Sequence, residues 1–218
     1  MTAVILQARL DSSRLPLKAL LPLDGEPLVF RVMSALRAVH ADAYVLACPA
    51  DSEASFAPYA ERAGFRVVVG SKEDVLERYC DALRATGADR VIRATGDNPF
   101  VFPDAADAIN RESILLGADY GAFASLPYGA GVEAVSAEAL LRAEREARLP
   151  LEREHVCPYL YGHPELFTLH RPLAPFAWRG PDVRITVDTA ADYERANALY
   201  AAMRGAVPFG SEVLRCAK

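Results

Sequence analysis

Three basic side chains and two hydroxyls lie within twelve residues near the start of the chain, in the segment 7–18. Arg9, Arg14 and Lys18 can together neutralise several negative charges, and Ser13 and the backbone N–H groups can add hydrogen bonds. This combination suits a polyphosphate ligand. A solvated, charged loop explains the segment equally well when the segment is considered alone.

Two aspartates stand at positions that suit a divalent cation. Asp97 lies in the run Ala-Thr-Gly-Asp-Asn-Pro and Asp188 in the run Arg-Ile-Thr-Val-Asp-Thr, and each follows a strand-like segment. Mg²⁺ binds to one or two carboxylates and completes its octahedron with phosphate oxygens and water. Capping of a turn by Asp97 and of a helix N-terminus by Asp188 is the alternative.

The segments that would position these residues alternate between strand-like and helix-like patterns. A short, continuous apolar run such as 3–7 is typical of a strand that is buried on both faces. Further strands are expected at 43–48, 66–69, 90–94, 118–125, 132–135, 167–170 and 183–187. Helices are expected at 27–38, 53–63, 103–116, 136–147 and 152–161, and others that begin at Ser71 and after Thr189.

This alternation, with short connections, predicts an α/β fold with a mostly parallel, doubly covered sheet and a small additional β element. Ligands of such sheets gather outside the carboxyl ends of the strands. We therefore expect the segment 7–18, Asp97 and Asp188 to meet at one edge of the sheet, within a single domain that spans 1–218.

Composition excludes several classes of function. The 218 residues carry a formal net charge of −5 without a basic stripe, which argues against a nucleic-acid partner. No apolar stretch approaches the roughly 20 residues that cross a bilayer, and no basic region precedes the first apolar run. The four cysteines form no C-x-x-C pair, and no G-x-G-x-x-G follows the first strand, so a zinc site and an NAD-dependent oxidoreductase are disfavoured. A cytoplasmic protein with small-molecule ligands and no membrane partner is expected.

Five motifs in order resemble those of the CMP-sugar (acylneuraminate and Kdo) synthetases in the cytidylyltransferase family. Among these, the chain most resembles the SpsF-like spore coat polysaccharide biosynthesis group. The motifs are Gln-Ala-Arg-x-x-Ser-Ser-Arg-Leu-Pro-x-Lys at 7–18, Ser-x-x-Asp-Val-Leu-x-Arg-Tyr at 71–79, Gly-Asp-x-Pro at 96–99, Glu-Arg-Glu-His-Val-x-Pro-Tyr at 152–159 and Val-Asp-Thr-x-x-Asp-Tyr at 187–193.

The resemblance implies a nucleotide-diphospho-sugar transferase (GT-A-like) fold and a Mg²⁺-dependent enzyme that works as a homodimer. The implied reaction is transfer of CMP from CTP to a small acidic or phosphorylated acceptor, with release of pyrophosphate, for surface polysaccharide biosynthesis. It also implies a nucleotide-binding part at about 1–117, an acceptor and dimerisation part at about 118–182, and a closing strand and helix at 183–204.

The same resemblance assigns roles to individual residues. The catalytic group comprises Arg9, Lys18, Asp97 and Asp188, of which Asp97 and Asp188 would hold the metal. The nucleotide-binding group comprises Gln7, Ala8, Arg9, Ser13, Arg14, Lys18, Ser71, Asp74, Thr95 and Gly96. The acceptor-binding group comprises Arg93, Glu133, Arg153 and His155. No general base is identified.

The chain departs from the family pattern at Asp11, Leu17 and Gly131. The first two replace glycines in the basic loop. Gly131 replaces the aspartate of a Gly-x-Asp-Val-Glu motif at 129–133, whose glutamate is Glu133 and which meets the acceptor in the family. Three alternatives stay open: an enzyme of the same fold that uses another nucleoside triphosphate, a glycosyltransferase that uses a sugar nucleotide, and a non-catalytic nucleotide-binding domain.

Overall fold

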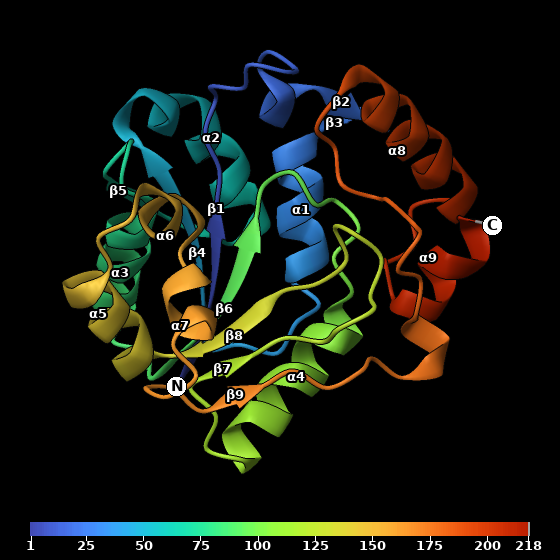
Figure 1. Ribbon diagram of the computed structural model, residues 1–218. Helices are drawn as coiled ribbons and strands as arrows, with labels where there is room; N and C mark the ends of the chain where they lie inside the picture. The colour runs from blue at the N-terminus through green and yellow to red at the C-terminus, as the bar shows by residue number, and fades with distance from the viewer. Residues whose placement is uncertain (218) are drawn as a thin grey trace.

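A seven-stranded sheet with the order β5-β4-β1-β6-β8-β7-β9 forms the centre of the protein in a computed structural model that describes residues 1–217 (Figure 1). Lys218, the end of the predicted domain, lies outside the described residues. The strands are β1 (Thr2–Gln7), β4 (Ala43–Pro49), β5 (Arg66–Gly70), β6 (Arg90–Thr95), β7 (Tyr120–Gly121), β8 (Glu133–Ser136) and β9 (Leu169–His170). The first four in space, β5, β4, β1 and β6, are parallel, and β8 runs antiparallel to β6. The predicted mostly parallel sheet is confirmed.

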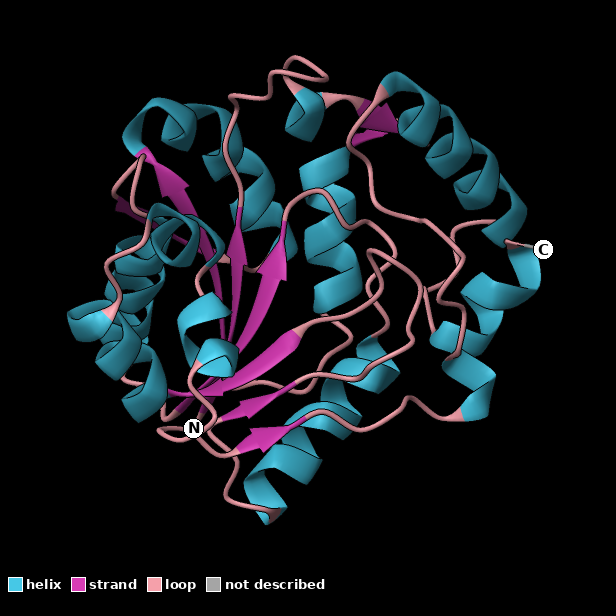
Figure 2. Cartoon of the chain, in the orientation of Figure 1, coloured by secondary structure: helices cyan, strands magenta, loops and turns pink. Residues whose placement is uncertain are grey.

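Helices cover both faces of this sheet (Figure 2). They are α1 (Leu28–Leu36), α2 (Ala50–Ala63), α3 (Val75–Thr86), α4 (Pro103–Leu115), α5 (Ala137–Glu146), α6 (Pro150–His155), α7 (Pro158–Gly162), α8 (Ala190–Met203) and α9 (Gly210–Cys216). One apolar cluster lies against α1, α2, α4, α8 and α9, and the other against α3, α5 and α7. The small β element is the antiparallel pair β2 (Pro22–Leu23) and β3 (Glu26–Pro27).

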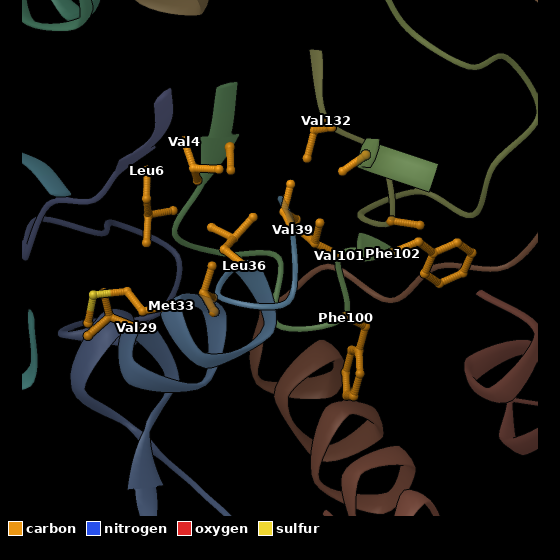
Figure 3. Close-up of a cluster of buried hydrophobic side chains, with 14 of the residues drawn as sticks. Val4, Leu6, Val29, Met33, Leu36, Val39, Phe100, Val101, Phe102 and Val132 are labelled. Atoms are coloured by element: carbon orange, nitrogen blue, oxygen red, sulfur yellow. The ribbon is translucent and has the colours of Figure 1, made fainter. Parts of the chain in front are cut away.

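Alternation along β1 explains why both faces are covered. Val4 and Leu6 are fully buried on the face of α1, where Figure 3 shows them near Met33. Ala3 and Ile5 are equally buried but belong to the opposite cluster. A strand with apolar residues on both faces needs a helical layer on each side.

Two predicted helices differ from the observed ones. The helix expected at 152–161 is divided into α6 and α7, because Val156 adopts a left-handed φ of 73° that a helix cannot accommodate. The helix expected from Ser71 begins at Val75 instead, since Asp74 is its N-cap and accepts from the Glu77 N–H at 2.9 Å. Ser71 accepts the N–H of Asp74 and so stabilises the turn before the helix.

The later strand predictions were partly wrong. The strand expected at 118–125 is reduced to the two residues of β7, and the segment 183–187 forms only an isolated bridge between Tyr128 and Arg184. The position of the small β element at 22–27 and the short helix α9 were not predicted. In the part of the chain that the structure describes, no helix has the length and apolarity that a membrane span requires.

Candidate active site

A cleft of about 610 Å³ lies at the carboxyl ends of β1 and β6. Its walls come from the loop after β1, from the start of α3, from the turn after β6, and from two segments of the later chain, 123–131 and 186–188. In Figure 1 the carboxyl ends of β1 and β6 point to the same side of the sheet. The parallel arrangement therefore brings together residues that are far apart in sequence.

Lys18 contacts both predicted metal-binding aspartates. Its ammonium lies 3.4 Å from Asp97 Oδ2 and 3.2 Å from Asp188 Oδ1. The Asp188 side chain is only 10% exposed and the Lys18 side chain 17%, so solvent screens these contacts weakly. The two carboxylates thus face the same point, the cationic position, which the Lys18 ammonium occupies.

Short hydrogen bonds hold Asp97 in place. The Thr95 hydroxyl donates to Asp97 Oδ1 at 2.7 Å, and the Asn98 amide donates to the Thr95 hydroxyl at 2.8 Å. Gly96 lies close to the loop after β1, where an added Cβ would meet Ala8 Cβ at 2.9 Å. This close approach lets the turn after β6 lie against the loop after β1.

The segment that carries Asp188 is held to the sheet by backbone contacts. The Val187 N–H donates to the Asp97 carbonyl oxygen at 2.9 Å, and the Thr186 hydroxyl donates to the same oxygen at 3.3 Å. On the other side, Gly129 has a φ of +103°, and a Cβ there would lie 2.6 Å from the Thr186 backbone nitrogen. The loop 125–131 can therefore pack directly onto the segment before Asp188.

Asp192 supports Asp188 from the first turn of α8. One oxygen of the buried Asp192 carboxylate accepts the N–H groups of Asp188 and Thr189 at 3.1 and 2.9 Å. Burial opposes the ionised form of Asp192, but hydrogen bonds from Arg184, Thr189 and these N–H groups hold its pKa well below the usual range. Arg184 also donates to Asp188 Oδ2 at 2.8 Å, which fixes that carboxylate from a second side.

The donor set at this point fits a hard divalent cation. Asp97 and Asp188 offer carboxylate oxygens on either side of the Lys18 ammonium, which occupies the cationic position. Among residues 1–217, no group of three His, Cys, Asp or Glu side chains is placed to hold a metal. Two carboxylates suffice for Mg²⁺, since phosphate oxygens and water supply its other ligands.

The basic loop is open to solvent at the mouth of the cleft. The Arg9 side chain is 49% exposed and lies 3.9 Å from Glu154, and the Arg14 side chain is 65% exposed and lies 3.0 Å from Asp188. Asp11, which departs from the family pattern, pairs with Lys72 at 2.5 Å. Lys72 also pairs with Asp51 at 2.6 Å, so it offsets only part of the negative charge that Asp11 brings to the basic loop.

Leu17, the second departure, takes the conformation for which a glycine is usually chosen. Its φ is +51°, and it immediately precedes the 3₁₀ turn η1 (Lys18–Leu20) that begins with Lys18. A left-handed leucine costs on the order of 1 kcal/mol relative to glycine. The loop keeps its shape at that cost.

Gln7 is held by a buried arginine that sequence reasoning did not select. Arg78 is 1% exposed, and its Nη2 donates to Gln7 Oε1 at 3.0 Å. Its Nη1 donates to the Ser71 carbonyl oxygen at 2.5 Å. Both Gln7 and Arg78 line the cleft.

Arg93 lines the cleft and forms a buried ion pair with Glu133. Its Nη1 lies 2.5 Å from Glu133 Oε2, and the Tyr120 hydroxyl donates to Glu133 Oε1 at 2.8 Å. Burial opposes the charged form of Arg93, but the facing Glu133 carboxylate more than compensates and raises the pKa of Arg93. Burial and the same carboxylate raise the pKa of Tyr120. Glu133 is thus engaged as the partner of Arg93.

Most of the predicted site residues line this single cleft. They are Gln7, Ala8, Arg9, Ser13, Arg14, Lys18, Arg93, Thr95, Gly96, Asp97, His155 and Asp188. Four others lie outside its lining: Ser71, Asp74, Glu133 and Arg153. Asp74 caps α3 and accepts from Arg153 Nε at 2.6 Å, so this pair joins α3 to α6.

Other lining residues were missed by the sequence prediction. They include Val75, Arg78, Asn98, Phe123, Leu126, Tyr128, Glu154 and Thr186. Arg78 had a detectable signal, because it interrupts the buried face of α3 between Val75 and Tyr79. The end of the loop 123–131 had a signal in the resemblance of 129–133 to the family's acceptor region, but its start had none, since its contribution depends on packing against later segments.

Comparisons with known proteins agree with one another. A family model described as cytidylyltransferase matches residues 3–210. The spore coat polysaccharide biosynthesis protein SpsF of Bacillus subtilis (strain 168) is 38% identical over 204 residues, which are 90% of this chain and 85% of SpsF.

Solved structures show the same fold. A cytidylyltransferase from Leptospira borgpetersenii serovar Hardjo-bovis (strain JB197) has a TM-score of 0.89 at 23% identity, covering 98% of this chain and 92% of that one. CMP:2-keto-3-deoxy-manno-octonic acid synthetase, solved in complex with CTP, has a TM-score of 0.72 at 17% identity, covering 92% of this chain and 98% of that one.

Proposed function

The chain belongs to the cytidylyltransferase family, and on that premise we propose that it transfers CMP from CTP to a sugar acid or a phosphorylated sugar, releasing pyrophosphate. The observation that carries the proposal is that Asp97 and Asp188 both contact the Lys18 ammonium, beside the basic loop. In the reaction, an oxygen of the acceptor forms a bond to the α-phosphorus of CTP. The bond from that phosphorus to the bridging oxygen breaks, and pyrophosphate leaves with the electron pair.

The chain's own residues would act mainly by positioning and by neutralising charge. Arg9 and Arg14 are exposed at the mouth of the cleft, and each would exchange its contact with a carboxylate, Glu154 or Asp188, for the triphosphate. Lys18 would leave the space between the two carboxylates and follow the phosphates. Asp97 and Asp188 would hold Mg²⁺, which when bound would neutralise charge on the α-phosphate and the departing pyrophosphate.

The acceptor side of the cleft favours an anionic molecule. Arg93 and His155 line it, and Arg9 lies within reach of the same wall through its contact with Glu154. SpsF is a spore coat polysaccharide biosynthesis protein, and the synthetase with a similar fold acts on a sugar acid. We therefore propose a sugar acid or sugar phosphate destined for a surface polysaccharide.

Incubation with CTP, Mg²⁺ and a panel of sugar acids and sugar phosphates tests the proposal. Mass spectrometry should detect a CMP adduct of one acceptor, together with one pyrophosphate per adduct and no adduct in the presence of EDTA. A glycosyltransferase would release a nucleotide and no pyrophosphate. Thermal stabilisation by GTP or UTP, but not by CTP, would contradict the choice of nucleotide.

A homodimer is a further part of this proposal, by analogy with the CMP-sugar synthetases. Size-exclusion chromatography with light scattering measures the molar mass directly. A value near the 23.7 kDa of one chain at working concentration would contradict it.

A further inference from the structure

The Gln7–Arg78 pair fixes the orientation of one amide at the wall of the cleft. Gln7 Oε1 accepts from Arg78 Nη2 at 3.0 Å. A guanidinium can only donate hydrogen bonds, so the amide atom that faces it must be the oxygen. The NH₂ group of Gln7 must then point the other way.

That NH₂ group is open to the cleft. In the described part of the chain, no protein atom accepts a hydrogen bond from Gln7 Nε2. The atom is also not one of the side-chain nitrogens that are buried from solvent without a hydrogen-bond partner. Gln7 itself lines the cleft. Arg78 is 1% exposed and held by the Ser71 carbonyl oxygen as well, so neither partner can easily rotate.

The position of Gln7 suits a nucleobase better than a phosphate. The three cations of the basic loop and the two aspartates already provide for a triphosphate and its metal ion. The side chain of Gln7 lies on the face of β1 that α3 covers, where it meets Arg78, whereas Val187, next to Asp188, packs on the opposite face. Ala8 and Val75 add apolar lining to the cleft. A neutral donor beside an apolar wall is the usual way of recognising the edge of a base.

We propose that Arg78 orients Gln7 so that the Gln7 NH₂ group donates to the cytosine edge, which makes this pair the device that selects CTP over UTP. Cytosine presents two adjacent hydrogen-bond acceptors, O2 and N3, whereas uracil carries a hydrogen on N3. Uracil shares the O2 acceptor, so the bond that discriminates is the one to N3. A donor fixed there satisfies cytosine and opposes the N3–H of uracil. Gln7 is the recognising residue, and Arg78 is a positioning residue. The proposal rests on the proposed function.

The variant Gln7→Glu provides the sharpest test. A carboxylate can still accept from Arg78 with one oxygen, but its second oxygen presents an acceptor to the cleft. Titration calorimetry with CTP and with UTP, both with Mg²⁺, measures the ratio of the two affinities. The wild-type protein should prefer CTP, and Gln7→Glu should lose at least about tenfold in CTP affinity and prefer UTP.

Two variants of Arg78 test the positioning role. Arg78→Met removes the donor, so the amide can rotate, and the preference for CTP should fall towards equality in protein that still unfolds cooperatively. Arg78→Lys keeps a donor and should retain the preference. Since Arg78 is buried and its substitution can prevent folding, the Gln7→Glu result decides alone in that case.

The outcomes separate this inference from the proposed function. A folded Gln7→Glu variant with the wild-type ratio of CTP to UTP affinity overturns the inference, and so does one that binds neither nucleotide, because a base edge is then not what Gln7 recognises. Failure of the wild-type protein itself to bind CTP contradicts the proposed function instead.

Discussion

Asp97 and Val187 are joined by a backbone hydrogen bond of 2.9 Å, from the Val187 N–H to the Asp97 carbonyl oxygen. The bond links the turn after β6 directly to the segment that carries Asp188. A backbone contact of this kind does not depend on the side chain of Val187. The spacing of the two acids is therefore set mainly by the fold, and their side chains can be changed without altering it.

Asp188→Asn should lower CTP turnover by roughly 10²- to 10³-fold, because one of the two carboxylates around the cation is lost. Steady-state release of pyrophosphate measures the effect. Asp182→Asn is a matched control, since Asp182 lies on the same segment but is exposed and outside the cleft lining. If turnover falls equally in the two variants, Asp188 has no catalytic role.

Gly129→Ala should both destabilise the protein and lower turnover. The new Cβ would lie 2.6 Å from the Thr186 backbone nitrogen and would displace the segment before Asp188. We expect an unfolding free energy lower by about 2–3 kcal/mol. Gly117 also has a positive φ, of +61°, but no atom lies within 4 Å of an added Cβ, so Gly117→Ala should cost only about 1 kcal/mol and leave turnover unchanged.

Asp192→Asn should reduce stability at neutral pH and reduce it less in acid. The folded protein holds the pKa of Asp192 below its ordinary value of about 4, so the ionised form stabilises the fold above that pH. This stability is lost progressively as the pH falls below about 4, towards the lower folded pKa. Urea unfolding should show a difference of about 2 kcal/mol at pH 7 that shrinks at pH 3. A difference independent of pH would contradict the assignment.

Lys18→Met should leave the two facing carboxylates without their protein cation. Turnover should fall by about 10²-fold, whereas stabilisation by Mg²⁺ alone should increase, because the metal no longer competes with an ammonium group. Thermal unfolding with and without Mg²⁺, in the absence of nucleotide, measures the second effect. Lys18→Arg keeps the charge and serves as the control. If Mg²⁺ stabilises Lys18→Met no more than it stabilises the wild-type protein, Lys18 does not occupy the position of the metal.

The cysteines should differ in their reaction with iodoacetamide. Burial raises the pKa of Cys48 to about 11 and of Cys80 to about 12, and it also raises that of Cys157 well above its usual range. Cys216 is partly exposed. At pH 8 the native protein should be alkylated first at Cys216, since the thiolate is the reactive form. Peptide mass mapping identifies the modified thiol.

The first half of the fold was predictable because its signals are local. Continuous apolar runs such as 3–7 indicate buried parallel strands, and the carboxyl ends of such strands lie at one edge. For this reason the sequence was sufficient to place the basic loop beside Asp97.

The second half depends on contacts that no local pattern encodes. The segment 183–187 resembles a strand, but its hydrogen bonds go to Asp97 and Tyr128 instead of to a full neighbouring strand. The left-handed Val156 similarly divides a helix whose sequence gives no warning. The role of Arg78 could not be predicted, because it depends on Gln7 lying opposite it.

Lys18, Asp97 and Asp188 come from widely separated parts of the chain, and the last of them is held by the first turn of α8. A growing polypeptide therefore has its basic loop long before it has both acids. During translation the protein should stay inert until α8 has left the ribosome and docked. An incomplete chain would present its basic loop without Asp188, the less exposed of the two acids that Lys18 meets in the finished fold.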